Sequence, residues 1–230
     1  MTIPDTLVPD TLVPDTLVKD IAVAVPGATA VFRRYKIDFC CKGGVPLSEA
    51  ATARGVDLAL VLGDLAALNG DETEAPDATE ALIPYIVERY HEVHRAEFPE
   101  AIRMARRVEA VHRDSPDCPH GLGDLLAIMA HELDEHQAIE EQMLFPAMLG
   151  GHYDLTHPVA RMMSDHEDLG EQLEALARLT TDFVPPHGAC TTWRALYAAC
   201  QKLDTDLRVH MHLENNILFP RFADLSLVTA

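Results

Sequence analysis

Two segments of the chain repeat one arrangement of possible metal ligands. In each segment a histidine is followed four residues later by a glutamate, and eight residues later by Leu-Phe-Pro: His136 with Glu140, and His210 with Glu214. Residues four apart lie on the same face of a helix, so each pair can direct an imidazole and a carboxylate toward one point. Such donors suit iron, manganese or zinc, and a carboxylate can bridge two ions. The repeat predicts a metal site, and bridging carboxylates would allow it to hold two ions.

The line of ionisable side chains continues one helical turn backwards in both segments. Glu132 precedes His136 by four residues, and Asp206 precedes His210 by four. The neighbouring turns are apolar, so we expect the line to face at least partly inward. Buried carboxylates are costly without a partner, and two such helices would bring like charges together. A single His-x-x-x-Glu pair is usually a surface pair, but two matched copies favour a cation held between the helices.

Two other segments offer the remaining imidazoles, since all 12 histidines lie at or after His91. One segment, 89–94, carries both His91 and His94, and the other, 164–167, carries His166. One histidine from each segment would complete a set of four imidazoles and two bridging carboxylates. Such a set leaves room for an oxo or hydroxo bridge and for an exogenous ligand.

Long helices must position these side chains. Hydrophobic residues make up 48% of the chain and aromatic residues only 6%, with abundant alanine and leucine, which favours helix over sheet. From residue 79 onward the pattern predicts helices at about 79–112, 121–149, 158–181 and 190–224, with a kink at Pro99. The breaks between them are short or moderate and rich in Pro, Gly, Asp or His. We therefore predict an all-α fold containing an up-down-up-down four-helix bundle.

The part before the bundle divides into three stretches. Residues 4–18 read PDTLV three times, and a proline every five residues forbids a regular helix, so residues 1–18 are expected to form a flexible tail. Residues 19–70 are predicted to form a small helical domain that carries the adjacent cysteines Cys40 and Cys41. The acidic stretch 71–78 is expected to link this domain to the bundle at 79–224.

The composition excludes several classes of partner. The net charge is −19, so phosphate backbones and anionic lipid surfaces should repel the chain, and we expect neither nucleic acid nor membrane as a partner. No apolar run approaches the ~20 residues that span a bilayer, and no secretory signal is recognisable. Five cysteines without repeated spacing argue against a disulfide framework. These features predict a cytoplasmic protein.

Several segments together resemble one known family. DFCCKGG, RYHEVHR, EEQMLFP, SDHEDLGEQLE, ACTTWRALY and LENNILFP, which occur in this order between about residues 19 and 222, are similar to segments of the iron–sulfur cluster repair di-iron proteins, the RIC, YtfE, ScdA and NorA-like proteins. The resemblance implies a hemerythrin-like bundle behind a small cysteine-bearing domain, and two non-haem iron ions with an oxo or hydroxo bridge. It also implies a role in the response to nitrosative and oxidative stress.

The resemblance extends to individual residues. By motif, the implied iron ligands are His91, His136, Glu140, His166, His210 and Glu214. His91 is preferred to His94 because it occupies the Arg-Tyr-His position. Glu132 and Asp165 would lie near the site or its access path, although the family more often has glutamate at the position of Asp165. With Asp206, they are the candidates for residues around the ligands.

Cys40 and Cys41 match the family's adjacent cysteine pair. Because they follow basic residues in a glycine-rich turn, they are candidates for reactive thiols. Transfer of metal or nitric oxide, or thiol redox chemistry, are the uses that we consider for them.

The resemblance implies nitric oxide or a dioxygen species as ligand and damaged iron–sulfur proteins as partners, for a monomer or homodimer. The function would be to bind nitric oxide, to supply iron for cluster repair, or both. An alternative is a nitric oxide-binding or nitric oxide-reducing protein of denitrification, so the sequence leaves open whether the protein is an enzyme.

Three further classes of function are weighed against these. A hemerythrin-like oxygen sensor or carrier would not need the adjacent cysteines. An iron-storage protein or ferroxidase usually has more carboxylates than histidines. A metal-free helical interaction module would leave the buried charges unexplained.

Overall fold

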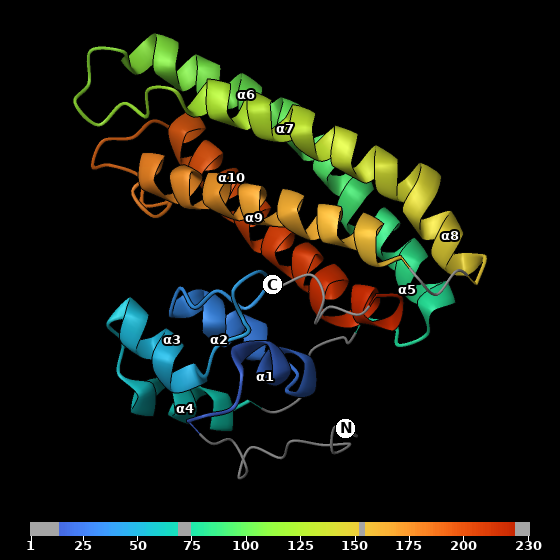
Figure 1. Ribbon diagram of the computed structural model, residues 1–230. Helices are drawn as coiled ribbons and strands as arrows, with labels where there is room; N and C mark the ends of the chain where they lie inside the picture. The colour runs from blue at the N-terminus through green and yellow to red at the C-terminus, as the bar shows by residue number, and fades with distance from the viewer. Residues whose placement is uncertain (1–13, 69–74, 152–154, 224–230) are drawn as a thin grey trace.

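The computed structural model describes residues 14–68, 75–151 and 155–223, shown in Figure 1. Within these ranges every regular element is a helix, and the only strand-like feature is an isolated bridge between Leu17 and Pro46. The predicted all-α fold is confirmed. None of the described helices is both long and apolar enough to cross a membrane.

Four long helical rods form the bundle. They are α5 (Thr79–Ile86) continued by a π-helical turn (Val87–His91) and α6 (Glu92–His112); α7 (Leu122–Ile139) continued by a π-helical turn (Glu140–Leu144) and α8 (Phe145–Leu149); α9 (Thr156–Leu179); and α10 (Thr191–His212) continued by a π-helical turn (Leu213–Leu218) and a short 3₁₀ turn (Phe219–Arg221). Contacts join α6 to α7, α7 to α9, α9 to α10, and α10 back to α6. This closed ring of sequential neighbours is the predicted up-down-up-down bundle.

The Leu-Phe-Pro segments explain where two rods leave the regular α-helix. Proline has no amide hydrogen, so the ladder of backbone hydrogen bonds is interrupted at Pro146 and Pro220. The π-helical turns Glu140–Leu144 and Leu213–Leu218 come just before these prolines. Turns of this kind are frequent at functional sites, and each of these two carries the glutamate of the His–Glu repeat. The predicted helices 121–149 and 190–224 are therefore composite rods.

The N-terminal unit contains α1 (Val18–Ala24), α2 (Ala28–Arg34), α3 (Leu47–Arg54) and α4 (Leu58–Ala66). Its beginning differs from the predicted boundary at residue 19. The backbone N–H groups of Leu47 and Ser48 donate to the carbonyl oxygens of Thr16 and Pro14, both at 2.9 Å. Residues 14–18, assigned above to a flexible tail, are thus held against the start of α3. The first two PDTLV copies, and residues 71–74 of the predicted linker, lie outside the described residues.

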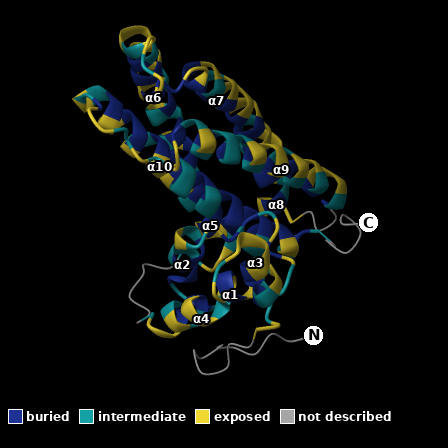
Figure 2. Ribbon diagram, turned by 90° about the vertical axis from the view of Figure 1, so that its left-hand side faces the viewer, coloured by how far each residue is buried: buried dark blue, intermediate teal, exposed yellow. Residues whose placement is uncertain are grey.

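The N-terminal unit lies against the bundle (Figure 2), and its apolar side chains share a cluster with those of α9 and α10. Phe39 is fully buried, with its ring centroid 5.5 Å from that of His212 in an edge-on arrangement. Asn216 adds a hydrogen bond from Nδ2 to the carbonyl oxygen of Phe39, at 3.1 Å. Apolar side chains of the unit and of the bundle therefore share one hydrophobic core.

A polar layer divides the apolar interior of the bundle. One apolar cluster includes Leu133 and Leu169 and continues into the N-terminal unit, while the other includes Phe145 and Phe219 at the opposite end. The repeated histidines and glutamates lie between the two clusters along the rods. Apolar side chains therefore flank this polar layer on both sides along the bundle.

Candidate metal centre

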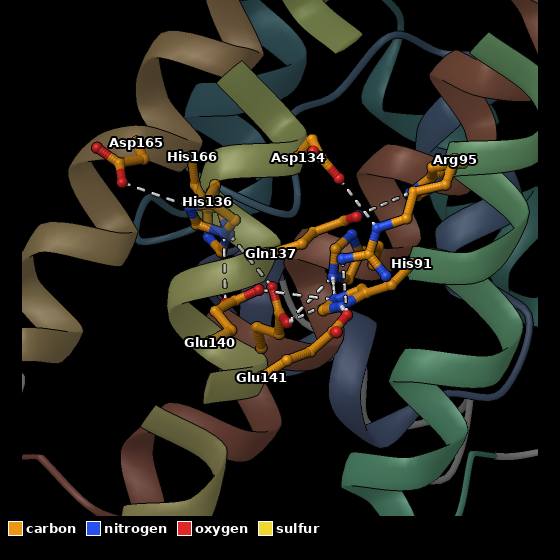
Figure 3. A network of polar contacts seen from close by, with 12 residues as sticks. His91, Arg95, Asp134, His136, Gln137, Glu140, Glu141, Asp165 and His166 are labelled. Carbon is orange, nitrogen blue, oxygen red and sulfur yellow. Dashed lines mark hydrogen bonds and ion pairs between the residues drawn. The ribbon is translucent and has the colours of Figure 1, made fainter. Parts of the chain in front are cut away.

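The six side chains predicted as ligands meet in this layer, as Figure 3 shows for those that it labels. They come from all four rods, and none is more than 6% exposed: His91, His136, Glu140, His166, His210 and Glu214. Their donor atoms form two groups of four, each within 4.8 Å of one another. One group contains His91 and His210, the other His136 and His166, and both glutamates belong to both groups.

The imidazoles face one another in pairs. The Nε2 atoms of His91 and His210 are 3.0 Å apart, and those of His136 and His166 are also 3.0 Å apart. At most one nitrogen of such a pair can donate a hydrogen to the other. A cation between the pair would use both nitrogens as ligands.

Each glutamate offers one oxygen to each pair of imidazoles. Glu140 places Oε1 3.3 Å from Nε2 of His136 and Oε2 3.6 Å from Nε2 of His91. Glu214 places Oε1 3.0 Å from Nε2 of His210 and Oε2 3.2 Å from Nε2 of His166. This is the arrangement expected of two carboxylates that bridge neighbouring ions.

The surroundings of the glutamates fit a positively charged occupant. In the described part of the chain, all four carboxylate oxygens are buried without a hydrogen-bond donor, apart from these imidazole contacts. Two buried carboxylates so close together need compensating positive charge. Histidine and carboxylate donors suit iron, manganese or zinc, so the residues present fit a pair of such ions.

The ionisation of the site follows from burial and from these close contacts. Burial alone would raise the pKa of Glu214, but the imidazole of His210 and its neighbours hold that pKa well below the ordinary value. Burial works to lower the pKa of His136, yet the carboxylates of Glu140 and Glu214 raise it to about 9. Glu214 is thus held ionised, and His136 must release a proton when a cation binds.

Three of the four histidines have a partner on the second ring nitrogen. His91 Nδ1 lies 2.8 Å from Oε1 of Glu141, and His166 Nδ1 lies 2.7 Å from Oδ1 of Asn215. His136 Nδ1 lies 3.3 Å from Oδ2 of Asp165. Metal-binding histidines commonly have such partners, which fix the ring orientation and its tautomer.

His210 differs from the other three histidines, because its Nδ1 is buried without a hydrogen-bond partner among the described residues. Its ring instead lies parallel to that of Tyr90, with centroids 5.5 Å apart and an angle of 7° between the planes. Stacking therefore orients this histidine where a hydrogen bond does not.

Glu141 and Asn215 are the residues that sequence reasoning missed. Each directly follows a glutamate of the repeat, and each serves a histidine of another rod. Arg95 anchors Glu141, with Nη2 2.8 Å from the same Oε1. Their adjacency to Glu140 and Glu214 was the available signal, but it does not show which histidine they reach.

The other sequence candidates lie at different distances from the ligands. Asp165 contacts His136, as described above. Glu132 is exposed and accepts a hydrogen bond from Gln172. Asp206 is buried, but it pairs with Arg89 at 3.1 Å and with Lys202 at 2.8 Å. The carboxylate of Asp206 is thus engaged by two basic side chains, and no hydrogen bond or ion pair joins it to the six predicted ligands among the described residues.

His94, the rejected alternative to His91, is also fully buried. Its Nδ1 lies 3.5 Å from Nε2 of Gln137, and its Nε2 has no partner among the described residues. Burial, aided by the neighbouring imidazoles of His210 and His91, lowers the pKa of His94 to about 2. His94 is therefore a neutral side chain, and it belongs to neither group of four.

An acidic cleft between α7 and α9 reaches the site. Its volume is about 540 Å³, and its walls include His136 and His166. It is lined by five carboxylates and one arginine: Glu132, Glu135, Asp165, Asp168, Glu171 and Arg161. This surplus of negative charge should attract cations toward the buried histidines.

Replacing Glu141 with glutamine tests whether the partner of His91 tunes the site. The amide can still accept from Nδ1, but it lacks the negative charge that makes the imidazole a stronger ligand. We expect metal affinity to fall by roughly 10- to 100-fold, measured by competition with a chelator. Glu92→Gln is the matched control, because Glu92 also lies next to a proposed ligand, His91, but is exposed. Equal losses in both variants would contradict the assigned role.

Two family models match different parts of the chain. Residues 82–222 match the family model Hemerythrin, described as the hemerythrin HHE cation binding domain. Residues 14–69 match ScdA_N, a domain of unknown function (DUF542). This matched range includes the third PDTLV copy, residues 14–18.

Curated relatives match across both parts of the chain. The iron-sulfur cluster repair protein YtfE of Musicola paradisiaca is 44% identical over 206 residues, covering 87% of this chain and 93% of that protein. Proteins of the same name from Dickeya chrysanthemi and Edwardsiella ictaluri are each 43% identical, with the same coverage.

Proposed function

Because the chain belongs to the family of iron–sulfur cluster repair proteins with a hemerythrin domain, we propose that it holds two non-haem iron ions and supplies iron to damaged iron–sulfur clusters during nitrosative and oxidative stress. The observation that carries this proposal is the pair of buried ligand groups that share Glu140 and Glu214. The names of the relatives suggest the use of the centre, and the geometry suggests its capacity for two ions.

In this proposal, His91 and His210 would hold one ion, His136 and His166 would hold the other, and Glu140 and Glu214 would serve both. When bound, with an oxo or hydroxo bridge between them, the ions would supply redox capacity and an open position for a small ligand. The protein side chains fix the geometry: Glu141, Asp165 and Asn215 hold the rings of three histidines. The apolar clusters on both sides leave the acidic cleft as the approach to these residues.

Nitric oxide or a dioxygen species is the small ligand that the apolar surroundings favour. Phe219 stacks on His166 with centroids 6.0 Å apart, and Phe145 lies against His91 with centroids 5.9 Å apart. Small uncharged molecules partition readily into such a region, whereas anions do not. We therefore propose capture of nitric oxide as a second use of the same centre.

The five cysteines are all free, including the neighbouring Cys40 and Cys41. Free thiols suit a reducing compartment, and the cytoplasm is where we place the protein.

The acidic cleft is the proposed route for iron. Neutralising two of its exposed carboxylates, in the variant Glu132→Gln with Asp168→Asn, should slow loading of ferrous iron into the apo-protein by roughly two- to five-fold at low salt. Final iron content should not change, because neither residue is a proposed ligand. Stopped-flow absorption at several salt concentrations measures the rate. A rate equal to that of the wild type at every salt concentration would exclude this route.

A reactivation assay tests the repair function directly. An iron–sulfur enzyme inactivated by nitric oxide is incubated anaerobically with iron-loaded protein, and recovery of its activity is followed. The wild type should restore activity and lose iron in proportion, whereas His136→Ala should do neither. Recovery that is as fast with His136→Ala, or with free ferrous iron at the same concentration, would contradict the proposal.

A further inference from the structure

The thiol of Cys41 lies against two other sulfur atoms where the N-terminal unit contacts the bundle. Cys41 Sγ lies 3.5 Å from Cys40 Sγ and 3.9 Å from Met211 Sδ of α10. Cys40 and Met211 are buried, with 2% and 0% of their surface exposed, while Cys41 is half-buried. An ion could therefore reach the cluster from solvent along Cys41.

Two anchors hold the cysteine backbone in place. Oδ1 of Asp38 accepts hydrogen bonds from the N–H groups of Cys40, Cys41 and Lys42, at 3.2, 3.0 and 3.3 Å. On the other side, Asn215 Nδ2 donates to the carbonyl oxygen of Cys40 at 3.0 Å. The two thiols are thus held next to each other, and that of Cys41 faces Met211 of α10. The carboxylate of Asp38 lies within 4.8 Å of both cysteine sulfurs. Its Oδ1 already accepts from these three amides and from Sγ of Cys40 at 3.4 Å, so we assign it to positioning the cysteines.

The distances suit a shared ion better than a disulfide. A disulfide needs an S–S distance of about 2.05 Å, and adjacent cysteines reach it only with strain. Metal–thiolate bonds of about 2.3 Å arranged trigonally would place the sulfur atoms roughly 4 Å apart. The two distances of 3.5 and 3.9 Å are close to that spacing.

The donor types select the ion. We propose that Cys40, Cys41 and Met211 form a second metal site, which binds one copper(I) ion through two thiolates and a thioether. Thiolate and thioether sulfurs are the soft ligands that copper(I) prefers. Zinc normally needs a fourth ligand, and the nearby His212 is already engaged, with Nδ1 2.9 Å from Asn216 Nδ2 and its ring against Phe39.

Charge and protons balance without a redox step. Each cysteine exchanges its S–H bond for a copper–sulfur bond, two protons leave to solvent, and the copper stays in the +1 state. The contact with Cys41 and burial raise the pKa of the Cys40 thiol, so the bound ion must displace its proton. The largely buried guanidinium of Arg208, which also pairs with Asp204 at 3.0 Å, opposes this rise. The site is separate from the six proposed iron ligands, although Cys41 Sγ lies 3.5 Å from the carbonyl oxygen of His166.

Anaerobic titration of the iron-loaded, full-length protein with copper(I), against a chromogenic copper(I) chelator, tests the site. We expect one copper per chain, with no loss of iron. Cys40→Ser and Cys41→Ser should abolish binding, and Met211→Leu, which conserves volume, should weaken it by at least about tenfold. Cys200→Ser removes a buried thiol elsewhere and should bind as the wild type does.

X-ray absorption of the copper-loaded wild type provides a readout that needs no variant. Neighbouring atoms that are all sulfur would support the assignment, while nitrogen or oxygen neighbours would overturn it. It would also be overturned by an absence of copper binding, by full binding in Cys41→Ser or Met211→Leu, or by tighter binding of zinc at the same sulfurs. Iron content, measured in every variant, shows that the fold and the iron centre are intact.

Discussion

Replacing Glu140 with glutamine should reduce the iron content from about two ions per chain to less than about one, because a single carboxylate serves both ions and an amide is a poor bridging ligand. Glu140 is fully buried, and its two oxygens face different histidine pairs. Weakening this one side chain as a ligand therefore affects both proposed ion positions. Iron analysis of the purified protein, together with its absorption spectrum, measures the effect.

Glu92→Gln is again the control, because it makes the same chemical change at an exposed position next to a proposed ligand. It should retain the full iron content. If Glu140→Gln also retains two ions with an unchanged spectrum, then Glu140 does not bridge them, and the proposed geometry is wrong.

Removing iron should lower the thermal unfolding midpoint of the bundle by roughly 15–30 °C. A ligand present at about a thousand times its dissociation constant stabilises the folded state by about 4 kcal/mol per site. Two sites give about 8 kcal/mol, and each kcal/mol shifts the midpoint of a chain of this size by about 2–4 °C. Calorimetry of the holo-protein and of the chelated protein measures the difference.

The double variant Glu140→Gln with Glu214→Gln separates the effect of bound iron from that of the chelator. Its midpoint should be the same with and without iron, since both bridging carboxylates are absent. A wild-type midpoint that does not change on chelation would mean that the six buried residues form a stable structure without an ion. It would also remove the energetic reason for a metal at this position.

The sequence predicted the repeated part of the centre because helical periodicity is local. His136 with Glu140, and His210 with Glu214, are four residues apart, and this spacing alone places each pair on one face. Spacing could not decide between His91 and His94, which are three residues apart on the same rod and are both fully buried. The family resemblance selected His91, and its Nε2 does face His210.

Contacts between residues that are far apart in the chain could not be predicted from the sequence. Glu141 reaches a histidine 50 positions away, and Asn215 reaches one 49 positions away, so only the packed bundle shows their roles. Docking of the N-terminal unit through Phe39 is likewise a contact between distant parts of the chain. Asp206 illustrates the same limit, because its position four residues before His210 does not show that Arg89 of another rod pairs with it.

The central claim is that the buried histidines and glutamates hold two iron ions. It is tested most directly by metal analysis of protein purified without added metal, with absorption spectra recorded anaerobically before and after nitric oxide. The predicted result is about two iron ions per chain and a spectrum that changes when nitric oxide is added to the reduced protein. A protein without iron, or one with a single zinc ion that resists exchange, would contradict the claim.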